Sequence, residues 1–263
     1  MINLVRNENT KIYRRTRTWI FFVAVLLGVI AIALVINQNM RVTHVSEDAW
    51  KFATTSSSLM SLVTIFTAVI AGDILASEFG SGTIKLLLIR PVSRTKILVS
   101  KYFSVLLFAF LFAIGLMIVS WVIGGFFFGF GGPKSVSISP ASGTAYQIPA
   151  SLEMLRSFAF ECVPLLMTVT VSFMISALFR SSSLAIAISI LLLFVGETIS
   201  GLLSRFSWDK FILFTNESLS QYFEGQPLVK GMALAFSITV LAVYFIVFHV
   251  VAWVAFTRRD VTA

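Results

Sequence analysis

Long apolar runs alternate with short polar segments along almost the whole chain. Six of these runs approach or exceed the roughly 20 residues that a helix needs to cross the hydrocarbon layer of a bilayer. They cover residues 18–36, 55–76, 102–130, 157–179, 183–203 and 232–256. The pattern predicts an all-α, polytopic membrane protein, with six transmembrane helices in a single domain over residues 1–263.

Composition favours the same class of protein. Of the 263 residues, 57% are apolar and 12% are charged, whereas a soluble domain is about 45–50% apolar and about 25% charged. A soluble chain of this length could not bury so much apolar surface. The first run is long and lacks a small-residue cleavage pattern after it, so we expect it to remain as a span rather than to be removed as a signal peptide.

The net charge of +8 is explained by the way the basic residues are distributed between the loops on the two sides of the membrane. With the N-terminus inside, 13 of the 20 Lys and Arg residues fall on the cytoplasmic side, as the positive-inside rule requires. Six acidic residues nearly balance the seven basic residues outside. We therefore expect both termini in the cytoplasm, and nucleic acid is not needed as a partner to explain the charge.

The polar segment 77–101 lies between the second and third runs and is rich in basic and turn residues. Thr83 is a candidate N-cap for a short helix, and Pro91 would end that helix. Ser93 would then cap a helix that continues into the third span. We expect a rigid helix–turn–helix beneath the bilayer, although an ordinary basic loop is the plainer alternative.

The segment also contains the ordered residues Glu78, Gly82, Thr83, Arg90, Pro91, Arg94 and Lys101. They follow the progression E-x-x-x-G-T, L-L, R-P-x-S-R and K. This progression resembles the cytoplasmic loop of ABC-2 type transporter permeases. The opening 6-RNENTKIYRRTRTWIF is also similar to small bacterial exporter permeases of the bacitracin-resistance and antimicrobial-peptide type.

The resemblance implies an ABC-2 (type V exporter-like) transmembrane domain, in which residues 1–17 form an amphipathic elbow helix. It also implies that the seven matching residues couple the chain to a separate ATPase, which would hold ATP and Mg²⁺. A second permease copy or paralogue, membrane lipids and an amphipathic substrate would complete the assembly in the bacterial plasma membrane. The alternative is a channel or secondary carrier that needs no ATPase.

Sequence motifs for catalysis are absent. The dipeptide Gly-Lys never occurs, so the chain carries no phosphate-binding Walker loop. The single cysteine, Cys162, and the two distant histidines, His44 and His249, give no metal-ligand spacing. We therefore expect no enzymatic activity and no cofactor or metal in this chain.

Three carboxylates fall inside the apolar runs, where charge is costly. Asp73 lies near the inner end of the second run, and we expect it either to pair with basic residues of 77–101 or to stay hydrated. Glu161 and Glu197 lie at similar depth in the outer half of consecutive helices. They are candidates for an outer gate, and polar contacts between helices are the structural alternative.

Two further features bear on a transport path. The second run carries small and polar residues that share one helical face, which is typical of close helix packing or of a path lining. They are Ser57, Ser61, Thr64, Ala68 and Gly72. The segment 204–231 is rich in aromatic residues, and we expect a short re-entrant or surface helix there at the outer mouth.

Overall fold

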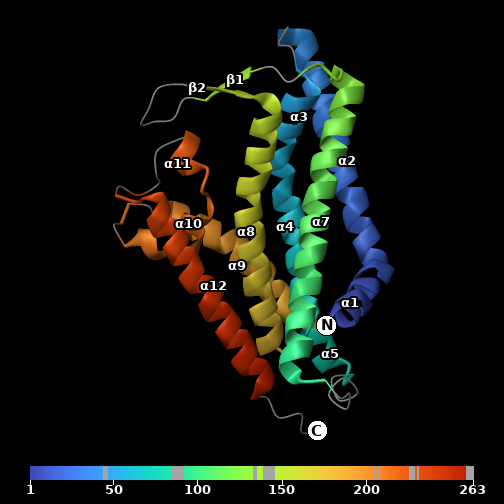
Figure 1. Cartoon of the computed structure of the whole chain (residues 1–263), viewed down its shortest axis with the longest axis vertical. Helices are drawn as coiled ribbons and strands as arrows, with labels where there is room; N and C mark the ends of the chain where they lie inside the picture. The colour runs from blue at the N-terminus through green and yellow to red at the C-terminus, as the bar shows by residue number, and fades with distance from the viewer. Residues whose placement is uncertain are drawn as a thin grey trace.

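The computed structural model consists of long helices that run side by side (Figure 1). It describes residues 1–43, 47–83, 92–132, 135–138, 146–203, 205–206, 208–224, 229 and 231–258. The elements are α1 (Ile2–Arg14), α2 (Thr16–Thr43), α3 (Ala49–Ser56), η1 (Ser57–Leu59), α4 (Met60–Asp73), α5 (Ala76–Gly80), α7 (Arg94–Phe128), β1 (Ser135–Ile138), β2 (Tyr146–Pro149), α8 (Ala150–Leu178), α9 (Ser182–Leu203), η2 (Asp209–Phe211), α10 (Leu213–Glu217), α11 (Gln221–Glu224) and α12 (Leu234–Thr257).

Six helical stretches among the described residues are long and apolar enough to cross a membrane. They are Thr16–Met40, Ala49–Gly80, Arg94–Phe128, Ala150–Leu178, Ser182–Leu203 and Leu234–Thr257. Each contains most of one predicted run, so the prediction of an all-α, polytopic membrane protein with six spans is confirmed. Ser93 also caps α7 as expected, because its side chain accepts a hydrogen bond of 3.4 Å from the amide of Lys96.

The second span forms the centre of the molecule. In its most apolar part, 67% of the residues are buried, compared with 11% in Leu234–Thr257. The stretch bends through α3, η1, α4 and α5, and the hydroxyls of Thr64 and Thr67 bond to carbonyls one turn earlier within α4. A helix surrounded by protein on most sides can carry such small and polar residues without exposing them to lipid.

The small and polar face of the second span divides into two parts. Thr64, Ala68 and Gly72 are buried. A Cβ atom added to Gly72 would lie 3.2 Å from Ser189 Oγ and 3.4 Å from the carbonyl oxygen of Ala185, so α4 and α9 approach closely there. Ser57 is half-buried and Ser61 is exposed. Helix packing therefore explains the lower part of this face.

The end of the molecule opposite α5 is more ordered than the sequence suggested. Part of the segment 131–156, which separates the third and fourth predicted runs, forms an antiparallel hairpin in which Val136 of β1 pairs with Ile148 of β2. Helix α8 then starts at Ala150 rather than at 157. The segment 37–54, between the first and second predicted runs, is also largely helical. Helix α2 continues to Thr43, and Asp48 caps α3 by accepting bonds from Trp50 N and Lys51 N.

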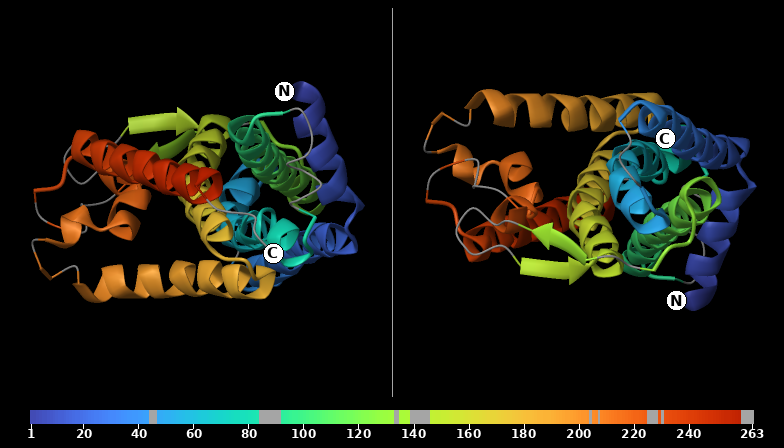
Figure 2. Two further views of the ribbon diagram at one scale, coloured as in Figure 1. Left: turned by 90° about the horizontal axis from the view of Figure 1, so that it is seen from below. Right: turned by 90° about the horizontal axis from the view of Figure 1, so that it is seen from above.

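The segment 204–231 forms short helices in its described part. Figure 2 shows these helices between α9 and α12, which lie on opposite sides of the molecule. Asn216 of α10 is fully buried and accepts a hydrogen bond of 2.6 Å from Ser237 of α12. On the other side, the ring of Phe214 lies directly over Gly196 of α9, where a Cβ atom would overlap it. The segment thus joins two spans.

Candidate functional site

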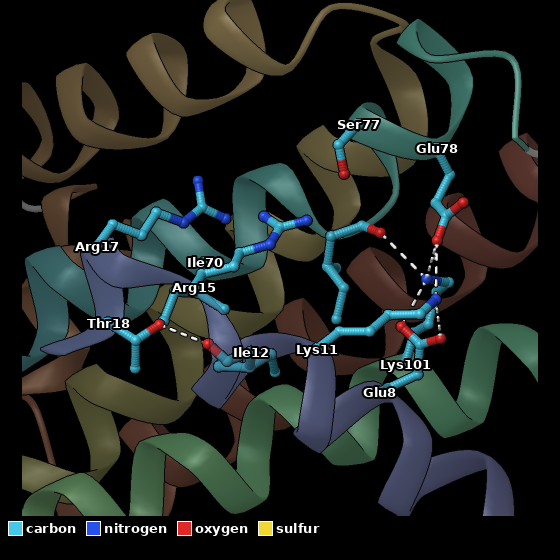
Figure 3. A pocket seen from close by; sticks show the side chains of 11 residues that line it. Glu8, Lys11, Ile12, Arg15, Arg17, Thr18, Ile70, Ser77, Glu78 and Lys101 are labelled. Atoms are coloured by element: carbon cyan, nitrogen blue, oxygen red, sulfur yellow. Dashed lines mark hydrogen bonds and ion pairs between the residues drawn. The ribbon is translucent and has the colours of Figure 1, made fainter.

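A cluster of charged side chains lies at the end of the molecule where α1, α5 and the start of α7 meet (Figure 3). We call it the basal cluster, and it comprises Glu8, Lys11, Arg15, Arg17, Asp73, Glu78 and Lys101. Three of these residues, Asp73, Glu78 and Lys101, are candidate site residues predicted from the sequence. The remaining four come from the first 17 residues of the chain.

The cluster is built on a break between α4 and α5. Helix α4 ends at Asp73 and α5 begins at Ala76, and three backbone groups at this break bond to side chains of other helices. The amides of Leu75 and Ala76 both donate to Ser176 Oγ of α8 at 3.0 Å, and the carbonyl of Ile74 accepts a bond of 3.3 Å from Lys101. These side chains fix the break and therefore the direction of α5.

Lys101 is the buried centre of the cluster, with a side chain only 1% exposed. Its Nζ lies 2.8 Å from Glu8 Oε2 and 3.2 Å from Glu78 Oε1, in addition to its bond to Ile74. An ammonium group has three donors, and these three acceptors use them all. Lys101 belongs to the motif that the resemblance assigns to ATPase coupling; in the structure it is buried and connects α1, α5 and α7 within the chain.

Glu78 binds two lysines and closes the turn that follows α5. Lys11 Nζ lies 3.2 Å from Glu78 Oε1 and 2.7 Å from Glu8 Oε1. Thr83, which we expected to cap a following helix, donates its hydroxyl to Glu78 Oε2. Gly82 has a φ of +72°, a left-handed conformation that glycine adopts without strain. The remainder of the predicted short helix, with Arg90 and Pro91, lies outside the described residues.

Asp73 pairs with a different part of the chain from the one expected. Its carboxylate accepts hydrogen bonds from Arg15, Arg17 and Ser182, and none of these residues belongs to 77–101. The backbone of Arg15 is extended between α1 and α2, which brings both guanidinium groups beside α4. Among the described residues, the partners of Asp73 therefore come from the N-terminal segment and from the start of α9. Asp73 holds the turn between α1 and α2 against the start of α9.

The charges of the cluster shift the pKa values of two side chains of α1, Glu8 and Lys11. Burial by itself raises the pKa of Glu8, but Lys101 and Lys11 outweigh it, and the pKa falls below its ordinary value of 4.5. Burial lowers the pKa of Lys11, but Glu8 and Glu78 outweigh it, and the pKa rises above 10.5. Both shifts mean that the charged forms stabilise the folded arrangement.

These shifts predict how tightly α1 is held at different pH values. The stabilisation of the folded arrangement by ionised Glu8 is complete above about pH 4.5, and it is lost as the pH falls through the lower pKa of the folded state. The contribution of Lys11 is complete below about pH 10.5 and is lost as the pH rises through its higher folded pKa. The protection of the α1 amides from hydrogen exchange, corrected for intrinsic rates, should be constant over the middle of the pH range and should decrease at both acidic and alkaline pH. Glu8→Gln should flatten the acid side, and an unchanged acid side would contradict the assignment.

Arg94, another described residue of the motif, lies at the foot of α7. Its guanidinium donates a hydrogen bond of 3.0 Å to the carbonyl oxygen of Thr257, at the end of α12. This bond satisfies one of the carbonyls that a helix C-terminus leaves without an intrahelical partner. Arg94 therefore connects the third and sixth spans at the same end as the basal cluster.

A cleft of about 520 Å³ opens beside the basal cluster. Its lining includes Lys11, Arg15, Glu78, Ser81 and Thr83. Ser81 and Thr83 are exposed, and both signs of charge are present on the walls. Such a surface can form charge-assisted hydrogen bonds with polar groups of another molecule.

Of the two carboxylates predicted in the outer half, the structure describes the side chain of Glu161 only. Glu161 of α8 lines a cavity of about 340 Å³ with Ser200, Phe214 and Glu217. Glu197 lies in α9, and its side chain lies outside the described residues. Glu217 was missed because it belongs to the polar loop region of the sequence rather than to an apolar run.

Metal binding has no support in the part of the chain that the structure describes, since no group of three or more His, Cys, Asp and Glu side chains there could hold an ion. His44 lies outside that part. His249 bonds through Nδ1 to the carbonyl oxygen of Phe245 at 2.8 Å and packs edge-on against Tyr102. Its contacts are those of a histidine in helix packing.

Comparison with known proteins gives matches over nearly the whole chain. It is 35% identical to "Uncharacterized protein YhcI" of Bacillus subtilis (strain 168), with 99% of each chain covered. It is 32% identical to "Uncharacterized membrane protein YdbK" of the same organism, over 95% of this chain and 99% of the relative. With its six apolar helices, this likeness identifies a multi-pass membrane protein. A family model described as "Protein of unknown function (DUF2705)" matches residues 17–262, and the chain belongs to that family.

Proposed function

We propose that this protein is the transmembrane permease subunit of an ATP-driven exporter of the ABC-2 type. It would act in the bacterial plasma membrane with separate ATPase subunits and a second permease copy or paralogue. The ATPases would bind ATP and Mg²⁺, because the sequence of this chain has no Walker loop. The exported molecule would be amphipathic, such as a peptide antibiotic, a drug or a lipid-like compound.

The observation that carries the proposal is the buried position of Lys101. Its bonds to Glu8, Glu78 and Ile74 make α1, α5 and the lower part of α7 one mechanical unit. A partner that pushed on the segment 77–101 would therefore move α1 and the second and third spans together, because packed elements transmit displacement rather than absorb it. A loosely attached loop would lose the same displacement locally.

The surface next to this unit supplies the means of docking. The cleft beside the basal cluster offers Lys11, Arg15 and exposed hydroxyls, and the sequence adds Arg90 within 77–101. Charge-assisted contacts of this kind fix the register of two proteins and speed their association. In this scheme, both termini and the basal cluster face the cytoplasm.

The path for the substrate belongs to the same proposal. Ser57, Ser61 and Thr64 would line it along the second span, and Glu161 and Glu197 would form its outer gate. The exposed position of Ser61 and the place of Glu161 beside a cavity support these assignments. Thr64 is buried in this chain, so its exposure to a path would require α4 to move relative to its neighbours.

Co-purification with a co-expressed ABC ATPase from the same organism tests the proposal. Arg90→Glu is expected to reduce recovery of the ATPase at least tenfold, because a reversed charge in the docking segment repels its partner group. Lys51→Glu is the matched control, since Lys51 pairs with Glu47 in an exposed position near the start of α3, and it should retain the ATPase.

The rival function, a channel or secondary carrier, predicts a different outcome. Arg90→Glu would then be neutral, and the purified chain would move substrate across a vesicle membrane without an ATPase. Either result would overturn the exporter proposal.

A further inference from the structure

An apolar groove of about 610 Å³ runs between the first half of α1 and the lipid-facing side of α7. Its floor on α7 consists of Phe103, Leu107 and Leu111, which are 45–53% exposed. These residues are four apart and share one helical face, and they extend about 12 Å along the axis. From α1, Ile2 and Val5 form the opposite wall.

The position of the groove places it at a lipid boundary. Phe103 follows Lys101 in α7, so the groove begins at the level of the basal cluster and continues toward the middle of the third span. An empty groove would forfeit dispersion contacts on its lining, and water would gain no hydrogen bonds from its apolar floor. In a membrane, a hydrocarbon chain is the molecule available to fill it.

The α1 wall of the groove carries a positive charge. Arg6 lines it and is exposed, and among the described residues no carboxylate forms an ion pair with its guanidinium. Asn9 and Tyr13 follow at intervals of three and four residues and also line the groove. A guanidinium group beside amide and phenol groups suits the phosphate and glycerol region of a lipid.

We propose that this groove binds one anionic glycerophospholipid from the leaflet that α1 faces. One acyl chain lies along Phe103, Leu107 and Leu111, and the phosphate is held by Arg6. The bound lipid fills the space between α1 and α7 on the side away from Lys101. This inference is independent of the exporter proposal, because it concerns a lipid site and not a path or a docking partner.

Native mass spectrometry of the full chain, exchanged into equal amounts of phosphatidylglycerol and phosphatidylcholine with identical acyl chains, tests the site. We expect the wild type to retain one phosphatidylglycerol molecule. Arg6→Gln should lower the preference for phosphatidylglycerol about fivefold, the weight of one basic side chain near an anionic lipid. Leu107→Trp and Leu111→Trp should each abolish retention, because an indole occupies the place of the acyl chain.

Two matched variants control for general effects. Arg14→Gln removes another exposed charge of α1, and Leu191→Trp adds an indole to a lipid-facing position of α9. Both should retain lipid as the wild type does. If Leu107→Trp and Leu111→Trp retained as much lipid as the wild type, the site would be overturned. An equal loss of preference for phosphatidylglycerol in Arg6→Gln and Arg14→Gln would also overturn it. Disulfide-linked dimers of Leu107→Cys would show that a second copy covers the groove, and would overturn it too.

Discussion

Replacement of Lys101 by Met is expected to lower the free energy of unfolding by about 3–5 kcal/mol. Lys101 is 1% exposed, and its removal leaves the buried carboxylate of Glu8 and the half-buried carboxylate of Glu78 without their shared ammonium group. Uncompensated buried charge is costly, because the low-dielectric surroundings do not replace the lost partner. Lys11 still bonds to both carboxylates but sits at the surface, so it compensates only in part.

Lys51→Met provides the matched control for this variant. Lys51 also forms an ion pair with a glutamate, Glu47 at 2.9 Å, but its side chain is 51% exposed. An exposed pair of this kind contributes about 0–1 kcal/mol. Reversible unfolding of both variants in the same detergent, followed by far-UV circular dichroism, gives the comparison. Equal losses in the two variants would show that Lys101 does not hold the basal cluster together.

Replacement of Asp73 by Asn is the second large effect, with an expected loss of about 1.5–3 kcal/mol. The change keeps the size of the side chain and removes the charge that accepts bonds from Arg15, Arg17 and Ser182. Hydrogen bonds to charged groups are worth more than neutral ones. The turn between α1 and α2 should loosen, and hydrogen exchange of amides near residues 15–20 should accelerate.

Asp48→Asn is the corresponding control at the other end of the molecule. Asp48 caps α3, and Asn serves as an N-cap about as well as Asp. That variant should therefore remain within a few tenths of a kcal/mol of the wild type. If Asp73→Asn left exchange near residues 15–20 unchanged, the link between α4 and the N-terminal segment would have no stabilising effect.

The spans were predictable from the sequence because the bilayer imposes a simple rule on each of them. About 20 apolar residues are needed whatever the neighbouring helices are. A run such as 102–130 can therefore be recognised as a span from the sequence alone. Local capping also follows from nearby residues, and Ser93 was predicted correctly for that reason. The hairpin β1–β2 was missed because its short strands lie in a segment rich in Gly, Pro and Ser.

The basal cluster was not predictable in the same way, because it joins residues far apart in the chain. Glu78 and Lys101 were singled out by a motif, but nothing local indicates that Lys101 also binds Glu8. The spacing of Glu8 and Lys11, three residues apart on one helical face, was the available signal. The partners of Asp73 depend on how α1 turns into α2 at Arg15, which is a property of tertiary packing rather than of hydropathy.

The central claim is that the segment following α5 docks on an ATPase, and cross-linking tests it most directly. A photoreactive benzoylphenylalanine is placed at Ser81, which is exposed beside the basal cluster, or at Lys51 near the start of α3. The cells are irradiated and the adducts are identified by mass spectrometry. The account predicts an ABC ATPase cross-linked at position 81 and absent at position 51. Absence of an ATPase at position 81, or equal adducts at both positions, would contradict it.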